Sequence, residues 1–206
     1  GLPPALDLRA VTDPTDLKLF IPGPTHVRRR ILEAQARPMI GHRSAFMKEL
    51  LAEVLPGVRA AFGTGGDVVV LSSSSTGAME AVSRSVVRPG KRVLHLPNGN
   101  FSDLWRKLSV AVGLDVAVEE RPWGEGWNEA KVAEALDKHG PVDAVMVAHC
   151  ETSTGALSDL AGVARAVRAA CPEALVCVDV TSSAAGTEID LDARDLDVAV
   201  GGVQQA

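Results

Sequence analysis

The chain has 206 residues, of which 46% are hydrophobic and 23% are charged, proportions that are ordinary for a globular protein with a sizeable core. Its net charge of −5 offers no basic surface for nucleic acid, and no apolar run reaches the roughly 18 to 20 residues that span a bilayer. The three cysteines have no paired spacing, which argues against a disulfide framework or a metal site and favours a reduced, cytoplasmic protein.

Turn-forming residues dominate the start of the chain. The stretches LPPA (2–5) and IPGPT (21–25) place prolines at short intervals, and proline favours extended or turn backbone over helix. The opening GLPPALDLRAVTDPTD lacks the basic-then-apolar order of a signal peptide. We therefore expect residues 1–45 to form an arm that lies over the rest of the protein or over a neighbouring subunit.

Beyond the arm, apolar runs of strand length alternate with longer segments of helical period. The expected strands are 67–72, 92–96, 115–120, 143–149, 174–180 and 197–203. The expected helices are 46–62, 77–88, 102–112, 129–139 and 160–170. Several strands are apolar almost throughout, which is typical of parallel sheets covered by helices on both faces. The sequence therefore predicts an α/β fold with three layers, αβα, and a mainly parallel sheet.

Hydroxyl side chains follow the first expected strand, at the edge where open parallel sheets bind ligands. Ser73 to Thr76 precede Gly77 and a run of good helix formers. Free N–H groups and the dipole at a helix start favour an anion, and hydroxyl groups add donors. A phosphate would fit this turn, although an ordinary helix N-cap with polar neighbours would use the same residues.

Three further strand ends carry aromatic or polar side chains. Phe101 follows the strand 92–96, where its ring can stack on a flat ligand or pack in the core. Thr152 follows 143–149 among other hydroxyl donors. Asp179 lies in the apolar run 174–180, and it either caps a loop or needs a cation or donor, because an unpaired carboxylate is costly to bury. Together these groups suit pyridoxal 5′-phosphate (PLP), whose ring nitrogen needs an acidic partner.

Five segments, in this order along the chain, resemble the class V PLP-dependent aminotransferases, the group that contains alanine–glyoxylate and serine–pyruvate aminotransferases. The segments are FIPGPTHV (20–27), RPMIGHRS (37–44), STGAMEAV (75–82), HCETSTG (149–155) and VDVTSSAAGTEID (178–190). Cysteine desulfurases of the same superfamily look less similar, because their pattern after the central histidine differs from ETSTG. The resemblance implies the PLP-dependent transferase fold of type I, with residues 46–206 forming most of its large PLP-binding domain.

The resemblance also implies roles for residues around the cofactor. Ser74, Ser75 and Thr76 match the turn that binds the PLP phosphate. Phe101 matches the aromatic residue that stacks on the pyridine ring, and Thr152 matches the hydroxyl near the phenolic oxygen of the ring.

Further roles fall on the last strands and on the arm. Asp179 matches the carboxylate that pairs with the pyridine nitrogen, and Thr181 matches a residue against the ring. Gln204 matches a second phosphate contact. Gly23 and the GHR segment (41–43) match family positions near the substrate side of the site and the dimer interface.

One departure affects the chemistry directly. By resemblance, the residue after Gln204 is the lysine that forms the Schiff base with PLP, but in this chain it is Gln205. An amide cannot form that bond, and it cannot transfer the proton between substrate and cofactor, so the chain as written is expected to be inactive. Gln205 is natural, engineered or an error in the sequence, and the residues alone do not decide between these. Milder departures are Ser75 and Ser102, where relatives often have glycine, and Leu104, where they often have arginine.

The resemblance implies an enzyme that moves an amino group between a small amino acid and a 2-oxo acid. Relatives continue for roughly a further domain, which carries the arginine for the substrate carboxylate, so we expect this chain to be an N-terminal portion without the small C-terminal domain. A homodimer is expected, because a second subunit completes the site in this fold. Gln205 supports an alternative, a protein of this fold that binds cofactor or a partner without transaminase chemistry. An enzyme that uses pyridoxamine phosphate is the weakest alternative, because such enzymes usually have histidine at this position.

Overall fold

The computed structural model describes residues 18–205, so residues 1–17 of the predicted arm and Ala206 lie outside the described residues. The helices are α1 (Arg29–Gln35), α2 (Ala45–Phe62), α3 (Ser75–Ser85), α4 (Asn100–Ala111), α5 (Glu129–His139) and α6 (Leu160–Ala170). The strands are β1 (Arg92–Leu96), β2 (Asp115–Val118), β3 (Ala144–Ala148), β4 (Cys150–Glu151), β5 (Ala156–Leu157), β6 (Leu175–Asp179) and β7 (Val198–Val200).

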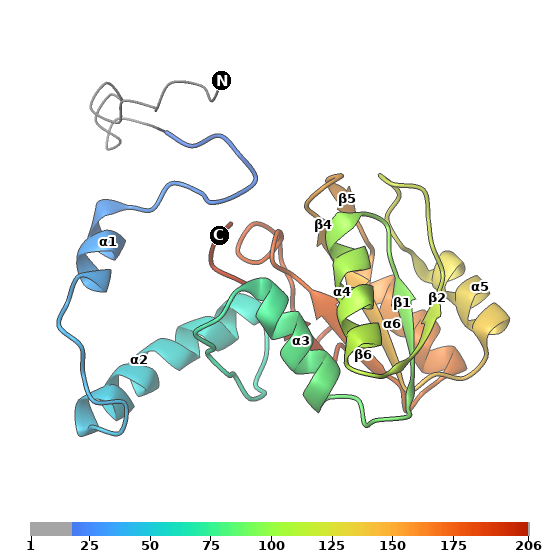
Figure 1. The fold of residues 1–206 in the computed structure, drawn as a ribbon, viewed down its shortest axis with the longest axis horizontal. Helices are drawn as coiled ribbons and strands as arrows, with labels where there is room; N and C mark the ends of the chain where they lie inside the picture. Colours follow the sequence, from blue (N-terminus) through green and yellow to red (C-terminus); the bar gives the residue numbers. More distant parts are fainter. Residues whose placement is uncertain (1–17, 206) are drawn as a thin grey trace, which may run out of the picture.

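Five of the strands form one parallel sheet in the order β2-β1-β3-β6-β7 (Figure 1). Parallel pairs need a crossover: α4, α5 and α6 supply it between β1 and β2, β2 and β3, and β3 and β6, whereas the turn-rich segment 180–197 joins β6 to β7. The register pairs Ala148 of β3 with Asp179 of β6, and Asp179 in turn with Val200 of β7. Asp179 therefore lies at the carboxyl edge of the sheet, between two other strand ends.

Helices cover both faces of the sheet, which confirms the predicted three layers. Alternate residues of β3 face opposite sides: Val145 and Val147 belong to the apolar core with α5 and α6, and Ala144 and Met146 belong to the core with α3 and α4. Both faces of β3 therefore pack against apolar side chains, and every residue of this strand is buried. This double burial explains why the strand is apolar throughout.

The predicted strand 67–72 does not form, and this prediction was wrong. No strand among the described residues pairs with this segment, and β7 is the edge of the sheet. Val69 and Val70 are 76% and 65% exposed. An apolar run forms a strand only where a neighbouring strand takes up its backbone hydrogen bonds, and the described chain supplies none here.

Two small features were not predicted. Helix α1 follows the Pro-rich stretch of the arm, and β4 and β5 form a hairpin of two residues per strand. Both are too short to produce a periodic pattern in the sequence. The remaining predicted helices and strands appear with ends shifted by at most a few residues, within the usual uncertainty of boundaries.

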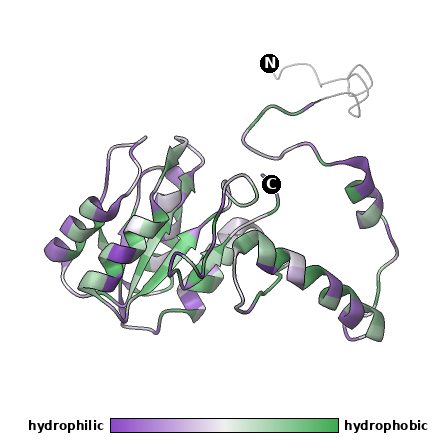
Figure 2. Cartoon of the chain, turned by 180° about the vertical axis from the view of Figure 1, so that it is seen from behind, coloured by the Kyte–Doolittle hydropathy of each residue, from purple (hydrophilic) through white to green (hydrophobic). Residues whose placement is uncertain are grey.

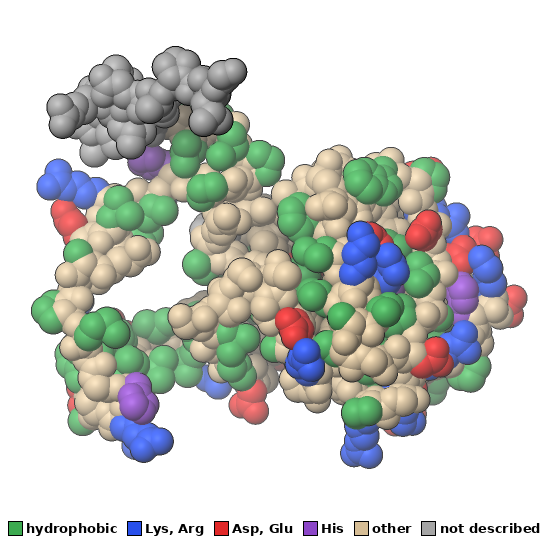
Figure 3. All heavy atoms as spheres, viewed as in Figure 1, with side chains coloured by type: hydrophobic (Ala, Val, Ile, Leu, Met, Phe, Trp, Pro, Cys, Tyr) green, Lys and Arg blue, Asp and Glu red, His purple; other side chains and the backbone are tan. Residues whose placement is uncertain are grey.

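Helices α1 and α2 extend away from the three-layer part of the chain, and α2 joins it only through its C-terminal end (Figures 1 and 2). Helix α2 has no buried residue, and its apolar side chains are visible on the surface of the arm (Figure 3). At its end, Phe62 packs against the core with α5 and α6. The backbone carbonyl of Phe62 accepts a hydrogen bond from the Leu191 amide at 3.0 Å.

Candidate functional site

A buried carboxylate marks the carboxyl edge of the sheet. Asp179 is 5% exposed, and its Oδ1 accepts hydrogen bonds from the backbone N–H of Thr181 at 2.9 Å and from the Thr181 hydroxyl at 2.6 Å. These bonds fix the direction of the carboxylate. Thr181 itself is buried, so two of the residues that the resemblance assigned to the cofactor ring lie together.

The charge on Asp179 lacks a cationic partner within residues 18–205, where it forms no ion pair. Burial raises the pKa of Asp179; the Thr181 hydrogen bonds oppose this shift, and the negative charge of Glu151 adds to it, so the pKa stays above its usual value. A buried carboxylate of this kind is stabilised by a cation placed beside it. The protonated ring nitrogen of PLP would supply that positive charge, so this residue fits the cofactor.

A chain of hydroxyl groups leads from the hairpin to the end of the described sequence. The Thr152 hydroxyl, in the turn between β4 and β5, hydrogen-bonds the Ser182 hydroxyl after β6. Ser182 in turn donates to Oε1 of Gln205. The structure therefore joins Thr152, predicted to lie near the ring, to the position predicted for the cofactor lysine, through a serine that the sequence reasoning did not single out.

The serine-rich turn lies at the start of α3, as predicted. Ser74 is the N-cap of this helix, and its hydroxyl accepts the backbone N–H of Gly77 at 3.2 Å, so at Ser74 the ordinary capping role is realised. Ser75 and Thr76 are half-buried. A Cβ at Gly202 would lie 2.1 Å from the Ser75 hydroxyl, which places the turn directly against the segment that leads to Gln204.

The arm reaches the same place. A Cβ at Gly23 would lie 3.1 Å from Cγ of Gln205 and 3.3 Å from Oε1 of Gln204. The backbone carbonyl of Gln204 accepts hydrogen bonds from the N–H of Thr25 at 3.0 Å and from its hydroxyl at 3.2 Å. In contrast, Gly41 is exposed, and a Cβ there would meet only Ser44, so the role of the GHR segment stays a prediction.

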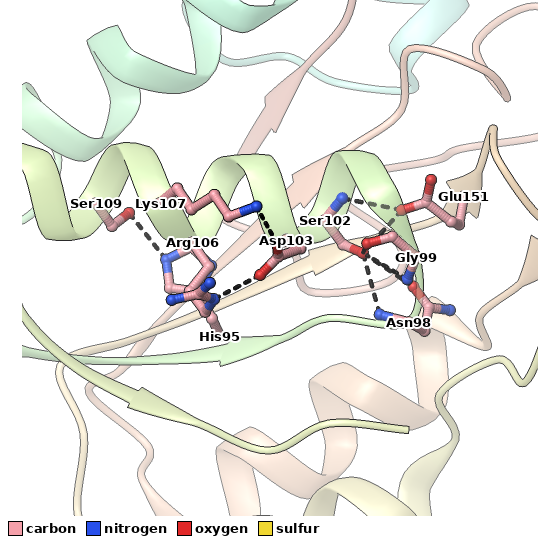
Figure 4. A network of polar contacts seen from close by, with 9 residues as sticks. All are labelled: His95, Asn98, Gly99, Ser102, Asp103, Arg106, Lys107, Ser109 and Glu151. Atoms are coloured by element: carbon pink, nitrogen blue, oxygen red, sulfur yellow. Dashed lines mark hydrogen bonds and ion pairs between the residues drawn. The ribbon is translucent and has the colours of Figure 1, made fainter. Parts of the chain in front are cut away.

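Phe101 lies in the first turn of α4, and Glu151, a residue that the sequence analysis did not single out, holds its backbone. Phe101 is half-buried, and its backbone N–H donates to Oε1 of Glu151 at 3.2 Å. Glu151 is 0% exposed, and Figure 4 shows its carboxylate facing the start of α4. The available signal was a carboxylate three residues after a fully apolar strand, inside the segment HCETSTG.

The described residues offer neither a metal-binding group nor a membrane-spanning helix. In residues 18–205, no group of three or more His, Cys, Asp or Glu side chains is arranged to hold a metal ion. None of the helices in the described part of the chain combines the length and the apolar composition that crossing a membrane requires. The polar groups described at the site are carboxylates, hydroxyls and backbone N–H groups, which are groups that suit a phosphorylated, cationic ring.

Comparison with known proteins places the chain among transaminases. The model for the aminotransferase class-V family matches residues 29–205. The serine–glyoxylate aminotransferase of Methylorubrum extorquens is 36% identical over 190 residues, which cover 91% of this chain and 47% of that protein. The L-aspartate–glyoxylate aminotransferase of Paracoccus denitrificans is 37% identical over 190 residues, covering 91% and 48%. The crystal structure of an alanine–glyoxylate aminotransferase from Nostoc sp. superposes with a TM-score of 0.85 at 30% identity, covering 96% of this chain and 53% of that one.

The chain spans about half the length of the curated relatives it matches. Within that half, the fold agrees with the solved structures of the family, and the cofactor of the family is PLP. The match extends to the last described residue, Gln205. The chain belongs to the class-V aminotransferase family.

Proposed function

We propose that the whole protein is a PLP-dependent aminotransferase that moves an amino group between a small amino acid and a 2-oxo acid, and that this chain is its arm (1–45) with most of its large domain (46–206). Relatives that act with glyoxylate support the reaction class. The observation that carries the proposal is Asp179, a buried carboxylate without a described cation at the edge where the predicted cofactor residues meet. Its position suits the ring nitrogen of PLP.

The described residues divide the work of binding. Bound PLP supplies an electron-withdrawing ring that stabilises negative charge on the substrate carbon. Asp179 keeps the ring nitrogen protonated, and Thr181 holds that carboxylate in place. The start of α3 and Gln204 bind the phosphate, Phe101 covers one face of the ring, and the Thr152 hydroxyl lies near its phenolic oxygen. The small amino acid and the 2-oxo acid enter on the side of Gly23.

A second candidate function is cofactor binding without transamination. Gln205 occupies the position of the cofactor lysine, and its side-chain oxygen accepts the Ser182 hydroxyl. A neutral amide held in this way cannot act as a proton carrier or attach the cofactor covalently. In this alternative the site binds PLP reversibly, and the protein serves as a binding or partner module.

The whole protein with Gln205, compared with its Gln205→Lys variant, separates the two functions. We expect both forms to bind PLP, and only the lysine form to retain it through dialysis and to transfer an amino group to glyoxylate. Borohydride reduction followed by peptide mass spectrometry locates the attachment. Transaminase turnover in protein verified to carry Gln205 would exclude the binding-only alternative, whereas failure of both forms to bind PLP would contradict both functions.

We also propose that the protein is a cytoplasmic homodimer. Cys150, Cys171 and Cys177 are all free, in keeping with a reducing compartment. Helix α2 exposes Phe46, Leu50 and Val54 at helical spacing, and an unpaired apolar stripe of this kind is typical of an interface. A second subunit packed against this helix would bury the apolar stripe.

A further inference from the structure

Glu151 is a buried carboxylate outside the set of residues assigned to the cofactor. It is 0% exposed, and among the described residues it forms no ion pair. A buried charge needs compensation, and here hydrogen bonds provide it. Oε2 accepts the backbone N–H of Ser102 at 2.9 Å and its hydroxyl at 2.7 Å. Oε1 accepts the N–H of Phe101 at 3.2 Å and both the N–H and hydroxyl of Ser153, at 3.1 and 2.7 Å.

These five donors keep the carboxylate ionised. Burial would raise the pKa of Glu151, but the N–H groups and hydroxyls of Ser102 and Ser153 outweigh it and hold the pKa below its usual value. Two of the donors are free N–H groups in the first turn of α4, where the helix dipole favours negative charge. Glu151 therefore caps α4 from another part of the chain.

The donors come from two segments that are far apart in the sequence. Ser102 belongs to the first turn of α4, next to Phe101, and Ser153 belongs to the β4–β5 turn, next to Thr152. The Ser153 hydroxyl also accepts the N–H of Asn100 at 3.0 Å. One carboxylate thus connects the turn that carries the predicted ring-stacking residue with the turn that carries the predicted ring-facing hydroxyl.

The backbone leaves room for this connection at one glycine. A Cβ at Gly99 would lie 2.3 Å from Cγ and 2.6 Å from Cδ of Glu151, so any side chain there would displace the carboxylate. Figure 4 shows Gly99 and Ser102 side by side against Glu151. The close approach of the loop to the Glu151 carboxylate therefore depends on the absence of a side chain at Gly99 and on the hydrogen bonds from Ser102.

We propose that Glu151 is a positioning residue, which sets the relative positions of Phe101 and Thr152 for the PLP ring by tying the start of α4 to the β4–β5 turn. The inference rests on the proposed cofactor roles of Phe101 and Thr152. The carboxylate acts through its neighbours and does not itself need to touch the cofactor. It also adds negative charge near Asp179, which favours a cationic ring at this edge.

The test compares Glu151→Gln with Ser109→Ala in the whole protein. The glutamine keeps the size of the side chain but loses the charge and one acceptor oxygen, whereas Ser109 is a buried hydrogen-bonding residue of α4 outside the site, bonded to His95 and Ser83. Hydrogen exchange is measured without PLP. In Glu151→Gln we expect residues 100–103 and 152–155 to exchange faster together, and in Ser109→Ala the second segment to stay unchanged.

PLP binding provides the second measurement. We expect Glu151→Gln to weaken PLP binding by about tenfold, the effect of losing a charge-assisted hydrogen-bond acceptor, and to reduce the visible circular dichroism of the bound cofactor. In a Phe101→Leu background the same change should have a smaller effect, because the part of the loss that acts through Phe101 has already occurred. PLP binding that Glu151→Gln leaves unchanged, or exchange that rises in one segment only, contradicts the positioning role. Wild-type protein that binds no PLP contradicts the proposed function instead.

Discussion

At the scale of single residues, His95 shows how a titratable group is accommodated away from the site. This β1 side chain is 1% exposed, and its Nε2 shares a hydrogen bond with the Ser109 hydroxyl at 2.8 Å. Ser109 bonds Ser83 at 2.9 Å, and the Trp105 indole N–H donates to Ser83 at 3.1 Å. Burial, aided by the positive charge of Arg106, lowers the pKa of His95 from 6.5 to about 3. The histidine is therefore neutral in the folded protein.

This neutral histidine makes the fold sensitive to acid. Below pH 6.5 the unfolded chain binds a proton at His95 that the folded chain does not bind until about pH 3, so the free energy of unfolding falls as the pH falls through this window. Between pH 7 and pH 5 the loss due to His95 is about 2 kcal/mol. Urea unfolding at both pH values measures it. The His95→Gln variant should lose about 2 kcal/mol less than the wild type, and equal losses in the two proteins would contradict the assignment.

At the scale of elements, the end of α2 depends on one backbone conformation. Gly63 follows the helix with φ of 60°, in the left-handed region, and a Cβ there would lie 2.5 Å from the Asp190 Cα. The turn directs the chain so that Leu191 and Asp192 donate backbone hydrogen bonds to the carbonyls of Phe62 and Gly63. These bonds attach α2 to the three-layer part of the chain.

Alanine substitutions at two glycines test how much the turn at Gly63 contributes to stability. We expect Gly63→Ala to lower the free energy of unfolding by more than about 1 kcal/mol, because the left-handed conformation and the close contact both oppose a side chain. Gly57, inside α2, has no atom within 4 Å of a Cβ. Gly57→Ala should therefore raise the helix stability by up to about 1 kcal/mol. Thermal and urea unfolding compare the two, and similar effects of the same sign would contradict this account.

The elements also show what could be predicted from sequence. Strands β1, β3 and β6 are buried on both faces, and their long apolar runs identified them. The segment 67–72 has the same composition, but a strand needs a partner, and composition does not reveal which strands are present to pair. The β4–β5 hairpin was missed because two residues per strand carry no period.

The sequence singled out individual residues of the candidate site, but it did not indicate the hydrogen bonds that join distant segments there. Asp179 and Thr152 were singled out because polar residues at the carboxyl ends of strands share one edge of a sheet. Glu151 was missed because its role depends on Phe101 and Ser102, about fifty positions away, which no local pattern encodes. Ser182 was missed for the same reason, since its hydroxyl matters only through Thr152 and Gln205.

At the scale of the whole molecule, α2 carries apolar surface that no other part of the described chain covers. Phe46, Leu50 and Val54 on α2 are 58%, 38% and 43% exposed. They recur every four residues and form one stripe. Such a stripe on a helix without buried residues is costly to leave in water, and a second subunit would remove it from solvent.

A charge placed in this stripe tests the homodimer. We expect Leu50→Glu in the whole protein to convert the dimer to a monomer, because a carboxylate would have to be buried in an apolar contact. Ala52→Glu adds the same charge on the opposite side of the helix and should leave the dimer intact. Sedimentation velocity measures both. A monomeric wild type, or a dimer that tolerates Leu50→Glu, would contradict this interface.

The all-parallel sheet also has a consequence for the rate at which the protein folds. The ladders β1–β2, β1–β3 and β3–β6 join strands that are separated by at least one whole helix, and β6 is separated from β7 by the turn-rich segment 180–197. No pair of neighbouring strands in this parallel sheet can therefore form as a local hairpin. The chain must close these long loops before the strand contacts stabilise it. During synthesis, β3 acquires its second neighbour only once β6 has emerged. Folding should accordingly be slow for a chain of this size, and the exposed edges of unfinished sheet make it dependent on protection from aggregation while it is made.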